Sequence, residues 1–306
     1  MKRSAGFVRV AAGALAIAAA MAAGGCSLMT PSLSELEAEQ ATAAVAAPVI
    51  KEDGVLTVAL NPADAPLAMA GEGDEITGYS VDLAAALADE LGLDVKFVGS
   101  ASASAALGDG EADIYLSAPS SEQSDDVDVL GTTMTDATAV FTKAEGDVDA
   151  STAAQAMASA TVAVQDQSAS QDILVRTGIE CEQVTCSNIN ECFEALDAGE
   201  ATYVVCDAIA GEYLARSYED VALVGTLDRA QNHGVAVSAG NVDLSSAVSD
   251  ALDAISADGT LDAVYARWFG ENPLDLTSMQ LPGVEVGERA ASDEGQDGGQ
   301  ADASAE

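Results

Sequence analysis

The feature that most constrains the fold of this chain is an alternation of strand and helix patterns that occurs twice. The first set of predicted segments is 55–60 (strand), 80–91 (helix), 95–98 (strand), 101–107 (helix) and 113–116 (strand). The second set is 161–164 (strand), 168–176 (helix), 182–186 (strand), 190–196 (helix) and 202–206 (strand). Strands that alternate with helices in this order predict an α/β fold with a mostly parallel sheet in each half.

The repeat is also visible in the residues at one turn. Residues 107–113 read Leu-Gly-Asp-Gly-Glu-Ala-Asp, and residues 196–202 read Leu-Asp-Ala-Gly-Glu-Ala-Thr. Both segments lead into the third predicted strand of their set. Two homologous lobes are the simplest explanation of a match in both residues and position.

The first predicted helix has the apolar face that packing against a sheet requires. Within 80–91, Leu83, Leu87 and Leu91 recur at four-residue spacing, which places them on one side of a helix. Ser80 begins this segment, and its hydroxyl is a favourable N-cap group. We therefore expect Ser80 to cap a helix that covers one face of the first sheet.

A third group of segments follows the second repeat. A strand is predicted at 234–238 and helices at 244–255 and 259–269. Both helices have apolar residues at helical spacing, and Gly270 is expected to end the second of them, as glycine commonly does after a helix. This group completes the lobes rather than starting a third repeat.

The start of the chain is typical of a lipoprotein signal peptide. Basic residues precede an uncharged, Ala-rich run at 10–23, which is too short to span a bilayer comfortably. The run ends at Cys26 in a pattern that resembles the bacterial lipobox, although Ala23 stands where leucine is usual. We predict a signal peptide at 1–25 and a lipid on Cys26; ordinary cleavage after 20–22 is the alternative.

The composition limits the partners of the chain. It has 11 Lys and Arg against 51 Asp and Glu, a formal net charge of −40, so nucleic acid and anionic lipid surfaces are poor partners.

Residues 26–51 have no strand pattern and are predicted to be a flexible tether. Residues 283–306 are acidic and rich in Gly, Asp and Ser, and are predicted to be a disordered tail.

Ligands of open parallel sheets bind beyond the carboxyl ends of the strands. In this chain those ends are 61–64, 117–121, 165–168 and 206–207. They are the predicted wall of a binding site.

Taken together, these segments resemble the family 3 extracellular solute-binding proteins, the amino-acid-binding components of ABC transporters. The resemblance runs from about Gly54 to Gly270, and its strength lies in several weak patterns that occur in order. The patterns are Gly54-Val55-Leu56-Thr57-Val58, Gly78-Tyr79-Ser80-Val81-Asp82-Leu83, 107–113, 162–168, 196–207, His233-Gly234-Val235-Ala236-Val237, and 258–270.

The resemblance implies a type II periplasmic-binding-protein fold, with two lobes joined by two crossing hinge segments near 137–142 and 232–236. Lobe 1 is expected at 52–139 plus 235–275, and lobe 2 at 144–230. The implied function is that of a monomeric extracytoplasmic lipoprotein that binds a small ligand without a cofactor. The implied partner is an ABC permease in the membrane to which the chain is anchored.

The resemblance also assigns ligand-binding roles. Asp207 matches the carboxylate that receives the α-ammonium group of an amino acid, although an aspartate at a strand end also commonly caps the next helix. Ser168 matches a hydroxyl residue at a helix N-terminus, where backbone amides favour an anionic group. The remaining predicted ligand-binding residues lie in lobe 1: Asn61, Asp64, Leu67, Ser117 and Ser120.

Several positions depart from the family pattern. Members that bind α-amino acids have an arginine that grips the α-carboxylate, and Asp125 stands at that position here. Asp64 and Leu67 occupy positions where aromatic residues usually stack on the ligand, and Gln167 replaces a glycine before Ser168. These departures predict a cationic or amine-rich ligand.

The alternative is that the carboxylate grip has moved within the chain. Arg229 and His233, just before the second crossing segment, are the nearby cationic candidates for such a grip. His233 is the only histidine, and a histidine at this place is more often packed in a hinge than bound to a ligand.

Four cysteines besides Cys26 lie in the second repeat of a chain expected to be exported, which favours disulfides. Among the pairings, Cys186 with Cys192 is sterically easiest, and the spacings do not indicate a metal site.

The single histidine and the absence of a Ser-His-Asp pattern make an enzyme the least favoured function. A sensory or scaffold lipoprotein that kept the fold and lost the ligand is the second alternative.

Overall fold

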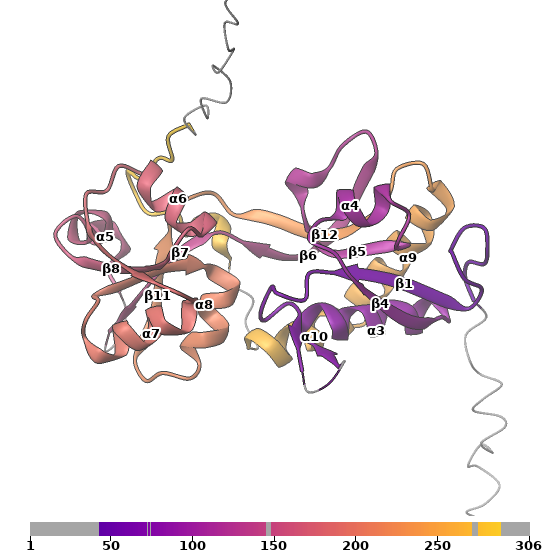
Figure 1. Cartoon of the computed structure of the whole chain (residues 1–306), viewed down its shortest axis with the longest axis horizontal. Coiled ribbons are helices and arrows are strands. Elements are labelled where there is room, and N and C mark those ends of the chain that lie inside the picture. Colours follow the sequence, from indigo (N-terminus) through magenta and orange to yellow (C-terminus); the bar gives the residue numbers. More distant parts are fainter. Residues whose placement is uncertain (1–42, 72, 74, 145–147, 271–274, 289–306) are drawn as a thin grey trace, which may run out of the picture.

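The computed structural model describes residues 43–71, 73, 75–144, 148–270 and 275–288. They form two lobes that lie side by side and are joined in the middle by long strands (Figure 1). The predicted signal peptide, the Cys26 lipidation site and most of the predicted acidic tail lie outside the described residues. No helix in the described ranges is long and apolar enough to cross a membrane.

Lobe 1 is built on a five-stranded sheet with the order β4-β1-β5-β12-β6. β12 runs antiparallel to both of its neighbours, and β1 is parallel to β4 and β5. Its helices and strands are β1 (Val55–Leu60), α3 (Tyr79–Leu91), β4 (Asp94–Gly99), α4 (Ala103–Gly108), β5 (Ile114–Pro119), β6 (Val127–Asp136), β12 (Gln231–Ser238), α9 (Val242–Ala257) and α10 (Thr260–Phe269). A short hairpin of β2 (Met69–Ala70) and β3 (Ile76–Thr77) and a 3₁₀ turn, η1 (Ser120–Glu122), complete it.

Lobe 2 repeats this plan with the sheet order β11-β7-β10-β8-β9. β7 is antiparallel to its neighbours β10 and β11, whereas β8 is parallel to β9 and β10. β7 is therefore the one strand of this sheet that runs in the opposite direction. Its helices and strands are β7 (Thr138–Lys143), α5 (Ala150–Met157), β8 (Thr161–Gln165), α6 (Ala169–Arg176), β9 (Glu182–Cys186), α7 (Ile189–Ala198), β10 (Tyr203–Asp207), α8 (Ala208–Ala215) and β11 (Val221–Thr226).

The internal repeat predicted from the sequence is confirmed at atomic detail. At the turn after α4 the amides of Glu111 and Ala112 both donate to the carbonyl of Ala106, and after α7 the amides of Glu200 and Ala201 both donate to that of Ala195. Both turns contain a glycine with positive φ, which relieves the clash that a side chain would cause there. The matched residues therefore encode the same helix termination in both lobes.

The first helix begins one residue earlier than predicted, and Ser80 is not its N-cap. Gly78 holds that position with a φ of 149°, and a Cβ there would lie 2.3 Å from the carbonyl oxygen of Leu67. The amides of Tyr79 and Ser80 donate to the carbonyls of Pro66 and Leu67 instead. Backbone acceptors of the preceding loop thus replace the expected side-chain cap.

Each sheet is covered by helices on both faces. In lobe 1, α3, α9 and α10 pack on one face around Leu83, Leu87 and Val248, whereas α4 packs on the other around Ala103 and Ala106. In lobe 2, α7 and α8 cover one face, and α5 and α6 cover the other. This arrangement confirms the predicted fold class.

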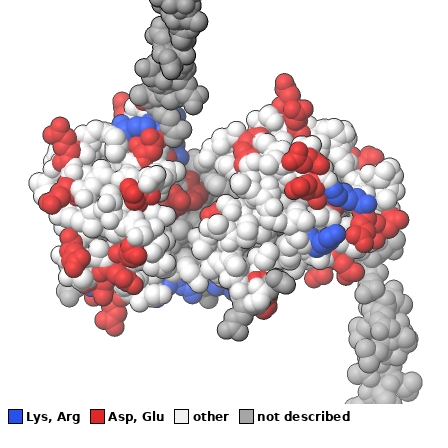
Figure 2. All heavy atoms as spheres, in the orientation of Figure 1, with Lys and Arg blue, Asp and Glu red and all other residues white. Residues whose placement is uncertain are grey.

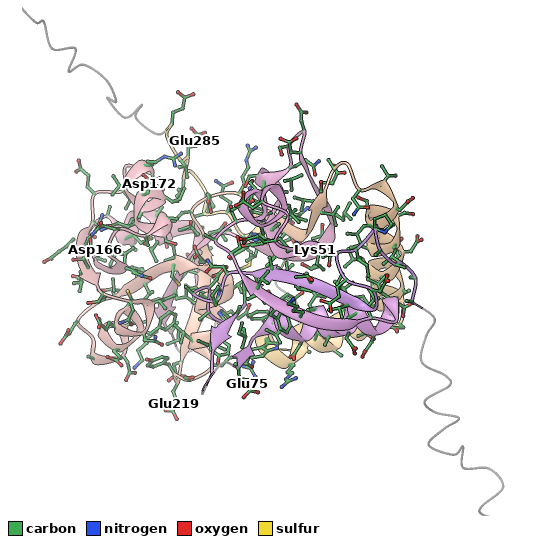
Figure 3. All side chains as sticks on the ribbon, turned by 45° about the vertical axis from the view of Figure 1, so that its right-hand side comes forward. Lys51, Glu75, Asp166, Asp172, Glu219 and Glu285 are labelled. Carbon is green, nitrogen blue, oxygen red and sulfur yellow. The ribbon has the colours of Figure 1, made fainter. Side chains whose placement is uncertain are left out.

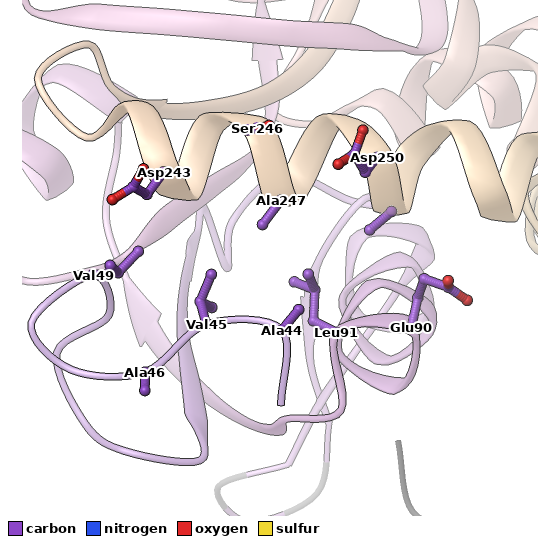
Figure 4. Close-up of a pocket in the computed structure, with 11 residues that line it drawn as sticks. Ala44, Val45, Ala46, Val49, Glu90, Leu91, Asp243, Ser246, Ala247 and Asp250 are labelled. Carbon is purple, nitrogen blue, oxygen red and sulfur yellow. The ribbon is translucent and has the colours of Figure 1, made fainter. Parts of the chain in front are cut away.

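The N-terminal part of the described chain packs on lobe 1, whereas the sequence analysis predicted a tether up to residue 51. Val45 and Ile50 are buried in the core of lobe 1, and the carbonyl of Val49 accepts a 2.7 Å hydrogen bond from Asn241. A groove of about 680 Å³ separates the segment around Ala44–Val49 from α9 and the end of α3 (Figure 4). Apolar side chains at both ends of this short segment explain why it is ordered.

The C-terminal part returns to lobe 2, which corrects the predicted boundaries of lobe 1 and of the acidic tail. After η2 (Leu276–Ser278), the amide of Leu281 donates to the carbonyl of Thr226, and Leu281 and Val284 are buried in the core of lobe 2. Arg176 donates through Nε to the carbonyl of Gly287 at 2.8 Å. Two buried apolar side chains outweigh the acidic, glycine-rich composition on which the prediction rested.

Most of the acidic residues lie on the surface. Figure 2 shows Asp and Glu spread over both lobes and at the boundary between them, with few Lys or Arg. In Figure 3 the labelled side chains of Glu75, Asp166 and Glu219 point outward from the periphery. The acidic residues that matter for a binding site are the few that lie where the lobes meet.

Candidate functional site

The predicted wall residues come from the carboxyl ends of strands in both lobes. Asp64 follows β1, Ser117 lies in β5 and Asp207 ends β10. Asp64 of lobe 1 and Asp207 of lobe 2 are close enough to act on each other electrostatically. The structure therefore brings two of the predicted carboxylates together across the cleft between the lobes.

The side chain of Asp207 does not cap the helix that follows it. It stands at the N-cap position of α8, but its side chain makes no capping hydrogen bond. Instead, its Oδ1 accepts a 2.8 Å hydrogen bond from the hydroxyl of Ser170 in α6. Because no capping hydrogen bond is made, Asp207 does not take the helix-capping role that the sequence left open, and the residue is exposed.

The backbone amide of Ile209 in the first turn of α8 is satisfied by Asp136, a residue that sequence reasoning missed. Asp136 ends β6 at the crossing into lobe 2, and its Oδ1 accepts from the amides of Ala137 at 2.8 Å and Ile209 at 3.1 Å. Burial, and after it the nearby Asp207, raise the pKa of Asp136 to about 8. The signal available in the sequence was an acidic residue directly before the first crossing segment.

Asp64 is also perturbed by its surroundings. Although the residue is exposed, desolvation of its carboxyl group by the surrounding protein, and then the charge of Asp207, raise its pKa to about 6. Burial raises the pKa of Tyr115 in β5 to about 12, with smaller contributions from Glu122 and Asp64. The cleft thus holds several acidic groups for which ionisation is unfavourable.

Ser117, near the end of β5, has an unusual backbone conformation, with a φ of 58°. Its hydroxyl is 2.8 Å from that of Ser80, and its carbonyl oxygen is 3.1 Å from Nδ1 of His233. A non-glycine residue with positive φ is uncommon and is found more often at functional positions. Ser80, expected to be a helix cap, is instead a partner of Ser117.

The other predicted ligand-binding residues have local roles. The side chain of Asn61 accepts from the amide of Ala63, and Leu67 is buried in the core of lobe 1. Ser120 begins the η1 turn. Their contact with a ligand stays a prediction, and for Leu67 the burial argues against it.

Ser168 is the N-cap of α6, as the family pattern implied. Its Oγ accepts from the amide of Gln171 at 3.1 Å and donates to the carbonyl of Gln165 at 2.8 Å. Gln167, which replaces the family glycine, adopts a φ of 57°. The residue therefore takes the backbone conformation that a glycine would, at the cost of strain.

No Lys or Arg of the described chain forms an ion pair with a cleft carboxylate. Among the described residues, ion pairs join Lys96 to Glu52, Lys143 to Asp197, Arg176 to Asp172 and Arg267 to Asp82. Arg229 faces the segment of Leu276 and Gln280. Burial lowers the pKa of His233, so its ring is mostly neutral at pH 7 and supplies no fixed positive charge.

Asp125, at the position of the family arginine, does not contribute to the cleft. It lies in a separate hollow with Ser104, Leu107 and Ser238, beside α4. The residue at the position of the family arginine therefore lies away from Asp64 and Asp207 in this chain. The acidic character of the cleft comes from Asp64, Asp136 and Asp207.

The predicted disulfide is not present in this structure. Cys181, Cys186, Cys192 and Cys206 are all free cysteines. The side chains of Cys186 and Cys192 are nevertheless neighbours, as the favoured pairing requires, and their thiols lie 3.8 Å and 3.6 Å from the carbonyl oxygens of Val184 and Asn188. The described residues contain no cluster of His, Cys, Asp and Glu that could hold a metal ion.

The lobes also touch outside the cleft. The rings of Tyr213 in α8 and Trp268 in α10 lie 6.3 Å apart, and Arg216 donates to the carbonyl of Trp268 at 2.7 Å. Ile209 is buried in the core of lobe 1 although it belongs to α8. α8 is therefore the element of lobe 2 that contacts lobe 1, and it begins at Asp207.

Known proteins share this architecture. The L-cystine-binding protein TcyJ of Escherichia coli (strain K12) is 26% identical over 242 residues, which cover 72% of this chain and 85% of that protein. An ancestral cationic amino acid solute-binding protein matches with a TM-score of 0.61 at 26% identity, over 71% of this chain and 96% of that one.

A second solved structure supports the fold alone. The L-cystine solute receptor of Neisseria gonorrhoeae, in an unliganded open conformation, matches with a TM-score of 0.58 at 19% identity, over 73% of this chain and 94% of that one. The architecture is that of type II periplasmic binding proteins. The model of the bacterial extracellular solute-binding proteins, family 3, matches residues 56–271. The chain belongs to this family of amino-acid-binding proteins.

Proposed function

We propose that this protein is the extracytoplasmic, lipid-anchored solute-binding component of an ABC importer and that it binds a cationic amino acid or a related amine between its lobes. The observation that carries the choice of ligand is the pair of carboxyl groups of Asp64 and Asp207, which come from opposite lobes and act on each other. No Lys or Arg of the described chain is paired with them.

The electrostatics of the cleft favour a positive ligand. Asp64 and Asp207 come from opposite lobes, so an ammonium group between them attracts both and favours closure. Charge-assisted hydrogen bonds to a carboxylate are strong, and partial burial strengthens them further. A ligand with an excess of negative charge would meet repulsion from both sides without an arginine to offset it.

The names of two similar proteins agree with this choice at the level of ligand class. One is an ancestral cationic amino acid solute-binding protein and another is an ancestral arginine-binding protein bound to arginine. The lipid anchor at Cys26 and the permease partner rest on the sequence pattern and on the family. An enzyme on this fold is the less favoured alternative.

The direct test is a thermal-shift screen of the purified protein against L-arginine, L-lysine, putrescine, L-cystine, L-glutamine and L-glutamate. A ligand that binds only the folded state stabilises it by about 2.7 kcal/mol at 100 times its Kd, so the shift measures affinity. We expect shifts with the cationic compounds, none with L-glutamate, and loss of the shifts in Asp207→Asn.

The matched control is Asp253→Asn, which removes the same charge from the exposed face of α9. It should leave the shifts unchanged. Tight binding of L-glutamate with no response to amines would contradict the cationic ligand. No shift with any compound would favour a sensory or scaffold lipoprotein that has lost the ligand.

A further inference from the structure

Asp136 occupies a position that joins the hinge to the binding cleft. It is the last residue of β6, and its Oδ1 accepts hydrogen bonds from the crossing residue Ala137 and from Ile209 in the first turn of α8. One carboxyl oxygen therefore holds the crossing and the start of α8 together. Asp207, which precedes α8, makes no capping hydrogen bond to that helix and accepts a hydrogen bond from Ser170.

The second carboxyl oxygen of Asp136 has no protein partner within the described part of the chain. The only buried side-chain oxygen left without a hydrogen bond among those residues is Oε2 of Glu212, so Oδ2 of Asp136 retains access to solvent or ligand. The same side chain thus has one oxygen held by two backbone amides and a second oxygen that is not buried without a partner.

The groups around Asp136 are acidic or neutral. Asp207 faces it from the end of β10, Asp64 from the loop after β1, and the neutral Gln231 is its partner in β12. The thiol of Cys206 in β10, whose pKa is raised by burial and also by Asp136, is a further neutral neighbour. The amides of Ala137 and Ile209 favour the ionised form, but burial and the two carboxylates outweigh them. Because its pKa is about 8, the group is mostly protonated at pH 7 in the empty cleft.

We propose that Asp136 is a third ligand-binding carboxyl group of the cleft and that a bound cationic amino acid or diamine displaces its proton. This inference rests on the proposed function, because it requires a cation between the lobes. The O–H bond of the Asp136 carboxyl group breaks, the proton passes to the buffer, and an ammonium–carboxylate pair forms. No other reactant is required.

The proposal predicts a defined pH dependence. When binding expels one proton, the affinity rises about tenfold for each pH unit while the group is protonated in the free protein. The rise should end near pH 8, where Asp136 is already ionised before binding. A binding site in which Asp136 has only a structural role would show no such slope above pH 7.

The experiment is isothermal titration calorimetry of the purified protein with L-arginine and, separately, putrescine at pH 7. Titrations in phosphate and in Tris differ in heat by the number of protons released times the difference in buffer ionisation enthalpy. We expect nearly one proton released by the wild-type protein and nearly none by Asp136→Asn. The asparagine oxygen can still accept from the amides of Ala137 and Ile209, so the local structure is preserved.

Glu212→Gln is the matched control. Burial raises the pKa of Glu212 to about 7, so this carboxyl group titrates in the same pH range, but the only charged neighbour that affects it is Arg216. It should leave the proton release unchanged. The same control excludes a general effect of removing a protonated carboxyl group from α8 or its surroundings.

The outcomes separate the two proposals. Binding without proton release, or equal release in Asp136→Asn, overturns the role of Asp136 and leaves the proposed function intact. Absence of binding with every amine removes both. If Asp136→Asn does not fold, the wild-type pH profile decides, because an affinity that is constant from pH 6.5 to pH 8 contradicts the proposal.

Discussion

The hydroxyl of Ser170 donates a 2.8 Å hydrogen bond to Oδ1 of Asp207 and thereby connects the first turn of α6 to the end of β10. This contact orients Asp207, which the sequence had identified by resemblance as the partner of an α-ammonium group. The same hydrogen bond holds the Asp207 side chain in a position in which it does not cap α8. The hydrogen bond leaves the second oxygen of Asp207 for a ligand.

Loss of this hydrogen bond should weaken binding. In Ser170→Ala, Asp207 keeps its charge but loses its orienting partner, and a typical net hydrogen bond contributes about 0.5–1.5 kcal/mol. We therefore expect the Kd for L-arginine to rise by roughly 2–10-fold in calorimetry. Ser246→Ala makes the same change on the exposed side of α9 and should have no effect. An unchanged Kd in Ser170→Ala would show that this contact does not position Asp207.

Protonated carboxyl groups should make the empty protein less stable as the pH rises. The folded-state pKa values of Asp64 and Asp136, about 6 and about 8, lie above those of an unfolded chain, so the folded state binds more protons. Their destabilising effect grows from about pH 4 and is complete once the pH exceeds 8.

Asp136→Asn removes the larger of these two contributions. The variant should have a higher Tm than the wild-type protein at pH 8, and the difference should shrink towards pH 5. Asp253→Asn controls for the change in net charge. A difference in Tm that does not vary with pH would contradict the raised pKa.

The C-terminal segment should stabilise lobe 2. Leu281 is buried against Gly225 and the core of lobe 2, and truncation of a buried leucine costs about 2–5 kcal/mol. Leu281→Ala should lower the free energy of unfolding in urea by that amount, whereas Glu285→Ala, at an exposed position, should change it by less than about 0.5 kcal/mol. Equal effects would mean that this segment does not pack on the lobe in solution.

Gly78 should not tolerate a side chain. A Cβ at this position would lie 2.3 Å from the carbonyl oxygen of Leu67, and backbone atoms cannot move aside cheaply. We expect Gly78→Ala to lower the free energy of unfolding by about 1–3 kcal/mol, as for an overpacked core, and to weaken ligand binding through the displaced Asp64 loop. Gly240→Ala, with no heavy atom within 4 Å of its Cβ, is the control. Wild-type stability in Gly78→Ala would contradict the close approach.

Much of the fold could be predicted because its signals are local. The period of apolar residues identified the strands and helices of both repeats, and the Gly-Glu-Ala segments identified two equivalent turns with the same hydrogen bonds. Helices α5 and α8, strands β6 and β11 and the β2–β3 hairpin were not predicted, and β7 was expected only as part of a crossing segment. The start of α3 was misplaced because its first amides bond to a distant loop rather than to a side chain of the helix.

Some residues of the candidate site could likewise be predicted from the sequence, whereas others could not. Asp64 and Asp207 could be named in advance, because residues that follow strands of a parallel sheet lie at a common edge. Asp136, Ser170 and Ser80 could not, since each acquires its role from a partner brought near only by folding. Asp125 stands at the position of the family arginine, and the path of the backbone places it in a hollow beside α4.

The sequence by itself determined that this protein has two homologous α/β lobes, since hydrophobic periodicity and turn residues act over a few positions. Only the tertiary structure decided which carboxyl groups share the cleft and which ends of the chain join the cores. Those outcomes depend on burial and on charges contributed by both lobes. Neither quantity exists until the lobes have packed.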